Sequence, residues 1–204
     1  MLSGINENKY KEEVYPATQV YTKAEVDALI TQQITSMLVP CRNAIKSVIE
    51  ALKGMYIVKV YDTLATYPKL DLAKAGTIRT MGVGFSQENI LDKWNEFMLT
   101  SSFSAWYRTY VYLDEAYTFS TYITTDDGAC LYLNEQPINE QIASTVRTAV
   151  TIPFTAGWNT VDVLYTEGSG GDGFYFDTKN FNTLSQVRYA GAIQFDISLL
   201  EENI

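Results

Sequence analysis

The chain has 204 residues, of which 47% are hydrophobic and 13% aromatic, so it can bury a substantial core and is not a disordered protein. Its formal net charge of −9 is uneven: residues 1–84 contain ten basic and eight acidic side chains, whereas residues 85–204 contain five and sixteen. Phosphate backbones and anionic lipids would repel such an acidic C-terminal part, which argues against nucleic acid and membrane partners.

Residues 1–20 are polar and charged, and this composition predicts an N-terminal docking arm that orders when it meets a partner. The alternative is a frayed terminus of no consequence. Residues 1–40 lack the basic start and the continuous apolar run of a secretory signal. No segment has the length of apolar sequence that spans a bilayer, so membrane insertion is not expected.

A helix is predicted to begin at Thr22, because Glu25 follows three residues later and the two side chains form a capping box. Gly54 is well placed to end this helix. Pro40 has no backbone N–H to donate, so it must kink the helix or begin a second one.

Apolar residues recur along this segment with spacings of mostly three and four, which is largely a heptad rhythm. β-branched residues at these positions favour three helices, so residues 21–55 are predicted to form the stalk of a homotrimer. One amphipathic helix packed on its own domain is the alternative. The apolar positions are Val26, Ile30, Ile34, Met37, Cys41, Ala44, Val48 and Ala51, with Ile45, Ile49 and Leu52 widening the stripe.

Residues 56–84 begin with a β-branched and aromatic strand, YIVKVY, and end with a second candidate strand, TIRTMGVGF. The sequence leaves open whether these strands join the head or form a separate collar around the trimer axis. Gln87–Phe97 is predicted to be a short helix or a loop. Strand signals run from Phe103 to Asp196.

The stretch Tyr117–Asn134, YTFSTYITTDDGACLYLN, is predicted to form a β-hairpin. Phe119 and Ile123 alternate with polar residues, so one face of its first strand should be buried. Asp127-Gly128 is a favoured pair for a two-residue hairpin loop, because both positions need a positive φ.

This aromatic-rich strand, its Asp-Asp-Gly reversal and the following LYLN strand resemble the PA14-like family of β-sandwich domains. A second matching element is Thr151–Glu167, TIPFTAGWNTVDVLYTE, which leads into the glycine-rich loop Gly168–Gly173. The resemblance implies that residues 85–204 form an antiparallel β-sandwich head. Together with the predicted helix, this gives a mainly β fold with N-terminal α structure.

In sugar-binding members of that family, two adjacent aspartates hold a calcium ion that contacts sugar hydroxyls, and the matching residues here are Asp126 and Asp127. The resemblance thus implies calcium as the candidate cofactor, with Asn134, Asp172 and Tyr175 as candidate glycan contacts. In the alternative interpretation, the Asp-Gly pair only makes the turn. Further candidate calcium ligands are Glu135, Glu167 and Asp177. Trp106 and Tyr107 are further aromatic candidates for stacking on sugar rings, while Trp158 is expected in the core or a turn.

An enzymatic function is not expected. The chain has no histidine, which excludes Ser-His-Asp and Cys-His mechanisms. Cys41 and Cys130 form no CxxC motif, and both are expected to be small buried residues. A glycosidase would need two carboxylates across a cleft, and no spacing singles out a pair among candidates such as Asp114, Glu115, Asp162 and Asp177.

The phrase Tyr21–Ile30, YTKAEVDALI, is similar to the start of short helical stalks in bacteriophage head and tail fibre proteins. This resemblance implies a virion surface protein, assembled in the host cytoplasm and attached to a capsid or tail protein through residues 1–20. Its head would then adhere to host-surface polysaccharide. The alternative is a calcium-dependent carbohydrate-binding module or adhesin that does not belong to a virion, and a small glycosidase is a third hypothesis.

Overall fold

The computed structural model describes residues 21–62, 78–85, 101–125, 127–139, 147–169, 174–176 and 179–200. The chain divides into two compact units, Met1–Ser47 and Val48–Ile204, and the second is called the β unit below. The predicted arm at residues 1–20 and the predicted helix or loop at Gln87–Phe97 lie outside the described residues.

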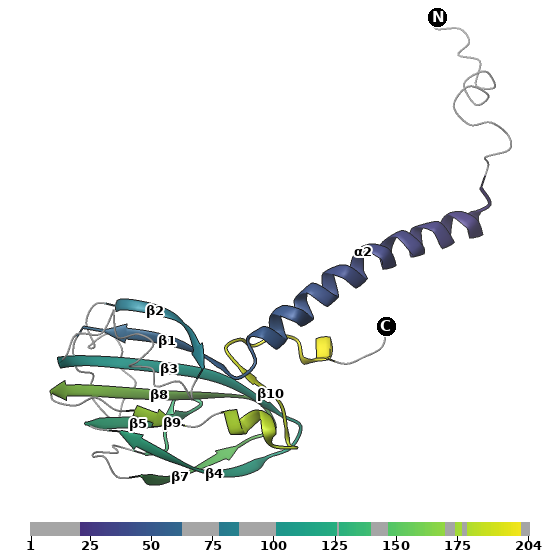
Figure 1. Cartoon of the computed structure of the whole chain (residues 1–204). Helices are drawn as coiled ribbons and strands as arrows, with labels where there is room; N and C mark the ends of the chain where they lie inside the picture. The colour runs from purple at the N-terminus through teal and green to yellow at the C-terminus, as the bar shows by residue number, and fades with distance from the viewer. Residues whose placement is uncertain are drawn as a thin grey trace, which may run out of the picture. The chain divides into compact units, whose positions relative to one another are not determined.

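The predicted helix is present as α2, Lys23–Ala51, and its capping box is confirmed (Figure 1). Glu25 Oε2 accepts hydrogen bonds from Thr22 N at 2.7 Å and Thr22 Oγ1 at 2.8 Å, and Thr22 Oγ1 accepts one from Glu25 N at 3.3 Å. These bonds to the charged form hold the pKa of the Glu25 carboxyl below its usual value. The helix continues through Pro40, which excludes the second of the two alternatives at this residue, a new helix starting there.

The last turn of α2 belongs to the β unit. Ile49 is 1% exposed, so it packs in the β unit and does not join the apolar stripe as the sequence predicted. Gly54 ends the helical segment with φ 77°, and its N–H donates to the carbonyl of Ala190 at 2.8 Å. The N–H of Ala192 donates to the carbonyl of Leu52 at 3.2 Å. Backbone hydrogen bonds therefore fix the exit from the helix.

The described strands of the β unit form two antiparallel sheets, which confirms the mainly β prediction (Figure 1). The larger sheet has the order β2-β1-β3-β8-β5-β6, with β10 also pairing with β3, and the smaller has the order β7-β4-β9. The strands are β1 Met55–Tyr61, β2 Ile78–Phe85, β3 Ser101–Leu113, β4 Tyr117–Thr125, β5 Gly128–Leu133, β6 Gln136–Pro137, β7 Thr148–Phe154, β8 Gly157–Ser169, β9 Phe174–Phe176 and β10 Val187–Gly191. Two short 3-10 helices, η3 Lys179–Thr183 and η4 Ile197–Leu200, flank β10.

Strand β3 organises the larger sheet. It pairs with β8 along its whole length, with β1 through its first half and with β10 through its second half. Because β1 also pairs with β2, both strands of residues 56–84 join the head's sheet, which answers the question that the sequence left open. The sheet thus begins at Met55 and not at the boundary predicted at residue 85. Local signals could not show this, since β1 residues pair with partners about fifty positions away in β3.

The predicted β4–β5 hairpin is wrong, because the two strands lie in different sheets. Strand β4 pairs with β7 and β9, whereas β5 pairs with β8 and β6. The alternation in β4 was predicted correctly, with Phe119 and Ile123 buried and Ser120 exposed. Every residue of β5 is buried, however, so this strand lacks the exposed face that a hairpin with one buried face would have. Asp127 therefore lies where the chain crosses between sheets.

A hairpin loop of the expected kind occurs at the other end of β5. Leu133 pairs with Gln136, which leaves Asn134 and Glu135 as the two loop residues, with φ values of 50° and 67°. Two consecutive positive φ values are typical of the type I′ loop that joins twisted antiparallel strands. Asn tolerates this conformation, whereas Glu rarely adopts it.

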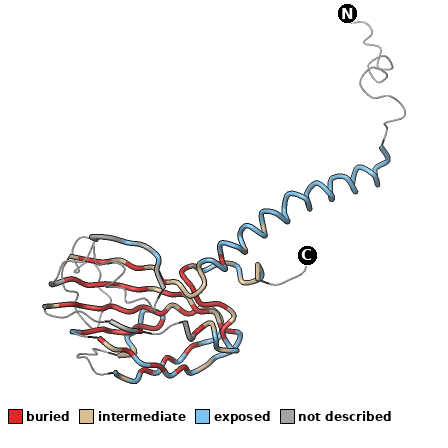
Figure 2. The backbone as a smooth tube through the Cα atoms, in the orientation of Figure 1, coloured by how far each residue is buried: buried red, intermediate tan, exposed pale blue. Residues whose placement is uncertain are grey.

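The larger of two hydrophobic clusters lies between the two sheets and is called the core below (Figure 2), and the smaller one, with Trp106, Tyr132 and Leu164, lies on the other face of the larger sheet. The core receives alternate side chains from both sheets, as expected for two packed antiparallel sheets. Phe181 of η3 is also part of this core and contacts three aromatic rings edge-on. Core members include Val58, Val60, Tyr107, Val111, Phe119, Ile123, Leu131, Ile152, Phe154, Val163, Tyr165 and Phe176.

Candidate functional site

The predicted calcium site lies at the crossing between β4 and β5. Asp127 is exposed, and its Oδ2 accepts a hydrogen bond from Gly168 N, the first residue of the glycine-rich loop. The structure therefore brings together the acidic reversal and the start of the loop that contains the candidate glycan contact Asp172. Asp126, Asp172, Asp177 and the side chain of Tyr175 lie outside what the structure describes.

Two buried polar groups lie on strand segments that lead into this crossing and this loop. Glu167 is buried, and its Oε2 accepts a short hydrogen bond of 2.5 Å from the Tyr165 hydroxyl. Thr125 ends β4, and its hydroxyl is buried without a hydrogen-bond partner among the described residues. These groups could serve a cation or a polar ligand. Yet no cluster of three or more Cys, Asp or Glu side chains is arranged to hold a metal ion within the described ranges, from which Asp126 is missing.

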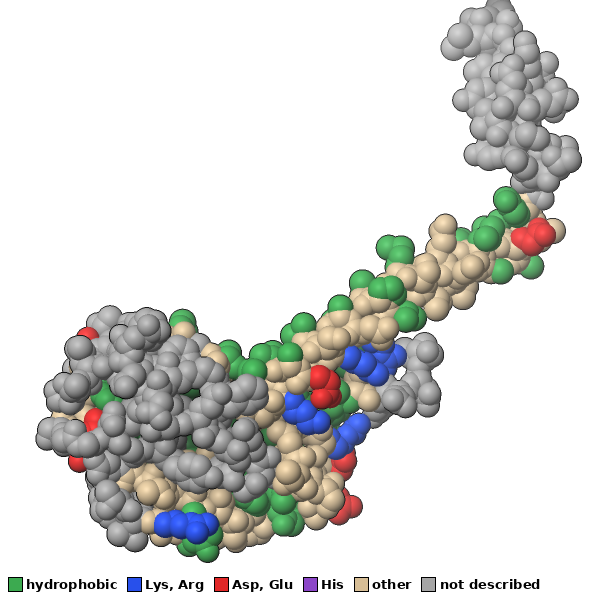
Figure 3. All heavy atoms as spheres, viewed as in Figure 1, with side chains coloured by type: hydrophobic (Ala, Val, Ile, Leu, Met, Phe, Trp, Pro, Cys, Tyr) green, Lys and Arg blue, Asp and Glu red, His purple; other side chains and the backbone are tan. Residues whose placement is uncertain are grey.

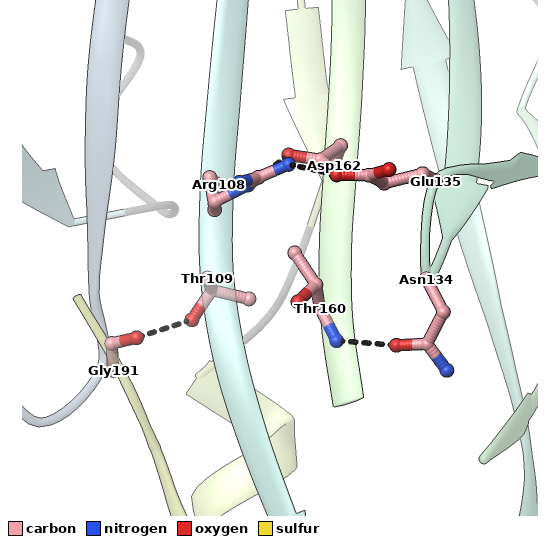
Figure 4. Close-up of polar contacts among 7 residues, drawn as sticks. All are labelled: Arg108, Thr109, Asn134, Glu135, Thr160, Asp162 and Gly191. Atoms are coloured by element: carbon pink, nitrogen blue, oxygen red, sulfur yellow. Dashed lines mark hydrogen bonds and ion pairs between the residues drawn. The ribbon is translucent and has the colours of Figure 1, made fainter. Parts of the chain in front are cut away.

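Asn134 lies away from that site. It follows the last residue of β5, whereas Asp127 precedes the first, so six strand residues, or about 20 Å at the usual rise, separate them. Its Oδ1 accepts a hydrogen bond from Thr160 N at 2.8 Å (Figure 4), and its Nδ2 donates to Asn159 Oδ1 at 3.3 Å. Asn159 is also bonded to the backbone of Thr155 in both directions. Asn134 thus joins two turns and has a structural role here.

A charged cluster that the sequence did not predict lies on the face of the larger sheet that points away from the core. Arg108 of β3 faces Asp162 of β8, donating from Nε to Oδ1 at 2.7 Å and from Nη2 to Oδ2 at 3.0 Å (Figure 4). Asp162 is fully buried, and burial raises the pKa of its carboxyl, while the two Arg108 bonds oppose that rise. Glu135 Oε1 lies 3.8 Å from Arg108 Nη2. The sequence signal for this cluster was a single charged residue within each of two largely apolar runs: Arg108 in YRTYVYL and Asp162 in VDVLY.

Two of the aromatic candidates for sugar stacking, Trp106 and Tyr107, are buried. Trp106 is 5% exposed and lies between two cations, with Lys59 Nζ 5.0 Å and Arg108 Cζ 4.9 Å from its ring centroid. Tyr107 is buried in the core. Trp158 is half-buried among aromatic rings, as expected for a core or turn residue. Tyr122, on the solvent face of β4, is exposed instead, with Arg147 Cζ 3.8 Å from its ring centroid.

The longest exposed apolar surface among the described elements is on α2. Its apolar side chains face solvent along the helix, with Met37 71% and Leu38 62% exposed (Figure 3). Cys41 is exposed in the single chain, whereas Cys130 is buried as expected. Neither α2 nor any other described helix is long and apolar enough to cross a bilayer. The remaining exposed apolar residues of the helix are Val26, Leu29, Ile30, Ile34, Val39, Ile45 and Val48.

No protein-family model matches the chain, and no curated protein matches it either. Among solved structures, β-glucosidase from Kluyveromyces marxianus is similar over 62% of this chain, with TM-score 0.45 and 18% identity for the selenomethionine-labelled protein and 0.43 and 17% for the glucose complex. The chain spans only 17% of the length of those β-glucosidase chains. The PA14 domain of the MpAFP antifreeze protein is similar over 60% of this chain and 80% of that domain, with TM-score 0.41 and 17% identity. All three likenesses are distant.

Proposed function

We propose that the protein is a non-enzymatic, homotrimeric display protein in which α2 joins three copies and each copy presents one β unit. The observation that supports this proposal is the apolar surface of α2. This helix of 29 residues, about 43 Å long, exposes large apolar side chains from Val26 to Val48. Burying one such side chain contributes about 1.5–3 kcal/mol, so association of several helices is strongly favoured over exposure to water.

We further propose that the protein is part of a bacteriophage particle. The phrase Tyr21–Ile30 and the polar segment before it are similar to the layout of bacteriophage fibres. We therefore assign residues 1–20 to attachment on a capsid or tail protein, and place the protein on the virion surface. Immunogold labelling of purified phage from a producing host tests this assignment, and label found only on host debris would contradict it.

Trimer formation is tested by light scattering on the full chain. The wild type is expected to have three times the mass of one chain. Ile34→Asp places a charge on the apolar face and is expected to give monomers, whereas Gln32→Asp changes an exposed polar position of the same helix and should leave the trimer intact. A monomeric wild type would refute the proposal. Deleting residues 1–84 would be a poor test, because it also removes β1 and β2 from the sheet.

A second candidate function is calcium-dependent carbohydrate binding by the β unit. The hydrogen bond between Asp127 and Gly168 favours it, because it joins the two segments that the PA14-like resemblance assigns to sugar binding. Calorimetric titration with calcium should show binding that Asp126→Asn abolishes. Glu115→Gln, which removes an exposed carboxylate elsewhere, should leave binding unchanged. Equal calcium binding by the wild type and Asp126→Asn would refute this candidate.

A further inference from the structure

The apolar residues of α2 follow a repeat of eleven residues more closely than a repeat of seven. Val26, Met37 and Val48 are eleven apart, as are Ile30 and Cys41, and Ile34 and Ile45. Every position of this set is exposed in the single chain. The set is called the eleven-residue stripe below.

A heptad frame fits the second half of the helix less well. From Met37 onward it requires Ala44 and Ala51 as core residues, and it leaves Ile45 on the flank. The eleven-residue frame places Ile45 in the core and Ala44 on the flank, so the larger apolar side chain is buried. A real helix has 3.6 residues per turn, between the 3.5 of a heptad repeat and the 3.67 of an eleven-residue repeat, so both stripes remain on one face over this length.

Beyond the first turn of the helix, charged side chains avoid the stripe. Between residues 28 and 51 they are Arg42, Lys46 and Glu50, spaced by four along another side of the helix. Three hydroxyl side chains beyond the first turn donate hydrogen bonds to the helix backbone: Thr31 Oγ1 to the carbonyl of Asp27 at 2.8 Å, Ser36 Oγ to that of Gln33 at 2.8 Å, and Ser47 Oγ to that of Asn43 at 2.9 Å. A partner for this surface therefore has to be apolar and uncharged, and its apolar side chains have to recur with the same eleven-residue spacing. A second copy of the same helix, parallel and in register, meets all three requirements.

We infer that the three α2 helices associate through the eleven-residue stripe, which gives a right-handed supercoil, opposite in hand to a heptad coiled coil. This inference rests on the proposed trimer and adds its geometry. In the resulting interface Cys41 and Ile30 point most directly at the axis, flanked by Ile34 and Ile45 on one side and by Met37 and Val48 on the other. Ala44 lies outside the contact.

Substitutions at positions 44 and 45 distinguish the heptad repeat from the eleven-residue repeat, because each repeat places only one of the two residues in the interface. In a Cys41→Ser background, Ile45→Cys and Ala44→Cys each give a full-length chain with one helical thiol. On mild oxidation, Ile45→Cys is expected to form disulfide-linked pairs several-fold faster than Ala44→Cys. Ile45→Asp should likewise dissociate the trimer, measured by light scattering, while Ala44→Asp should leave its mass unchanged.

The outcomes distinguish the two proposals. Equal or faster crosslinking at position 44 in a chain of trimeric mass would overturn the eleven-residue interface and leave the display function standing. A wild-type chain that stays monomeric and variants that do not crosslink at either position would overturn both. Because Cys130 is buried and present in every variant, its contribution is measured in the Cys41→Ser chain alone.

Discussion

Asp162 is a carboxylate that water does not reach, and Arg108, whose side chain is 20% exposed, is its bidentate partner. Desolvation of both charges offsets much of their attraction, so a pair of this kind contributes little net stability. Losing one partner is different, because the remaining charge is then buried without compensation. The cluster therefore acts mainly as a constraint on the register of β3 and β8.

Arg108→Met is expected to lower the free energy of unfolding by about 3–5 kcal/mol at neutral pH, because it leaves the Asp162 carboxylate buried and alone. The double variant Arg108→Met/Asp162→Leu should recover most of this loss. Both are measured by urea denaturation. Asp114→Ala, which breaks an exposed pair with Arg188, is the control and should cost less than about 1 kcal/mol.

The pH dependence of the stability of Arg108→Met tests whether the loss comes from the uncompensated Asp162 carboxylate. Without the guanidinium, the pKa of Asp162 in the folded chain rises further above the unfolded value, so the folded state binds the proton more tightly. The variant should therefore gain stability, relative to the double variant, as pH falls through that interval. If the free energy of unfolding of Arg108→Met stays below that of the double variant by the same amount at every pH, lost packing against Trp106 is the cause instead.

Glu135 has a positive φ that glycine adopts at lower cost. Glu135→Gly is expected to raise the free energy of unfolding by about 1 kcal/mol, since a left-handed conformation costs a residue with a Cβ about 1–2 kcal/mol. The long 3.8 Å contact with Arg108 offsets little of this gain, as Glu135 is largely exposed. Chemical denaturation measures the change, and Gln136→Gly in the adjacent strand should be destabilising.

At the scale of elements, β10 and the end of α2 meet without room for a side chain at Gly191. A Cβ there would lie 2.3 Å from the Tyr189 hydroxyl and 2.5 Å from the carbonyl of Leu52. Gly191→Ala is therefore expected to cost about 2–3 kcal/mol by overpacking, measured as a fall in the midpoint of urea unfolding. Gly157→Ala is the matched control: its Cβ would contact nothing within 4 Å, so only the strain of its φ of 86° applies, and the smaller loss is expected there.

The elements that the sequence predicted best are those that neighbouring residues determine. Thr22 and Glu25 are three residues apart, and their capping box formed as expected. The alternation in β4 was also correct, because one buried face leaves a period of two in the sequence. The partner of β4 was not predictable in this way, since pairing with β7 instead of β5 depends on residues about thirty positions away. Asp127 and Gly168 meet for the same non-local reason.

At the scale of the whole molecule, the proposed trimer couples stability to concentration. The melting temperature of the α2 helices is expected to rise with chain concentration, because mass action favours the associated trimer over separate chains. Circular dichroism at 222 nm over a hundredfold dilution measures this dependence. Gln32→Asp should behave as the wild type, and Ile34→Asp should show less helix and no dependence on concentration.

The path of the chain from α2 into β1 has a mechanical consequence. A tether that acts through the helix pulls first on the packing of Ile49 and on the hydrogen bonds of Leu52 and Gly54. It then pulls on β1, a strand that is hydrogen-bonded to β2 on one side and to β3 on the other. Antiparallel hydrogen bonds run perpendicular to the strands, so a pull along β1 loads both ladders in shear at once and does not break their bonds one by one. The load therefore enters the larger sheet at one of the strands that is hardest to extract.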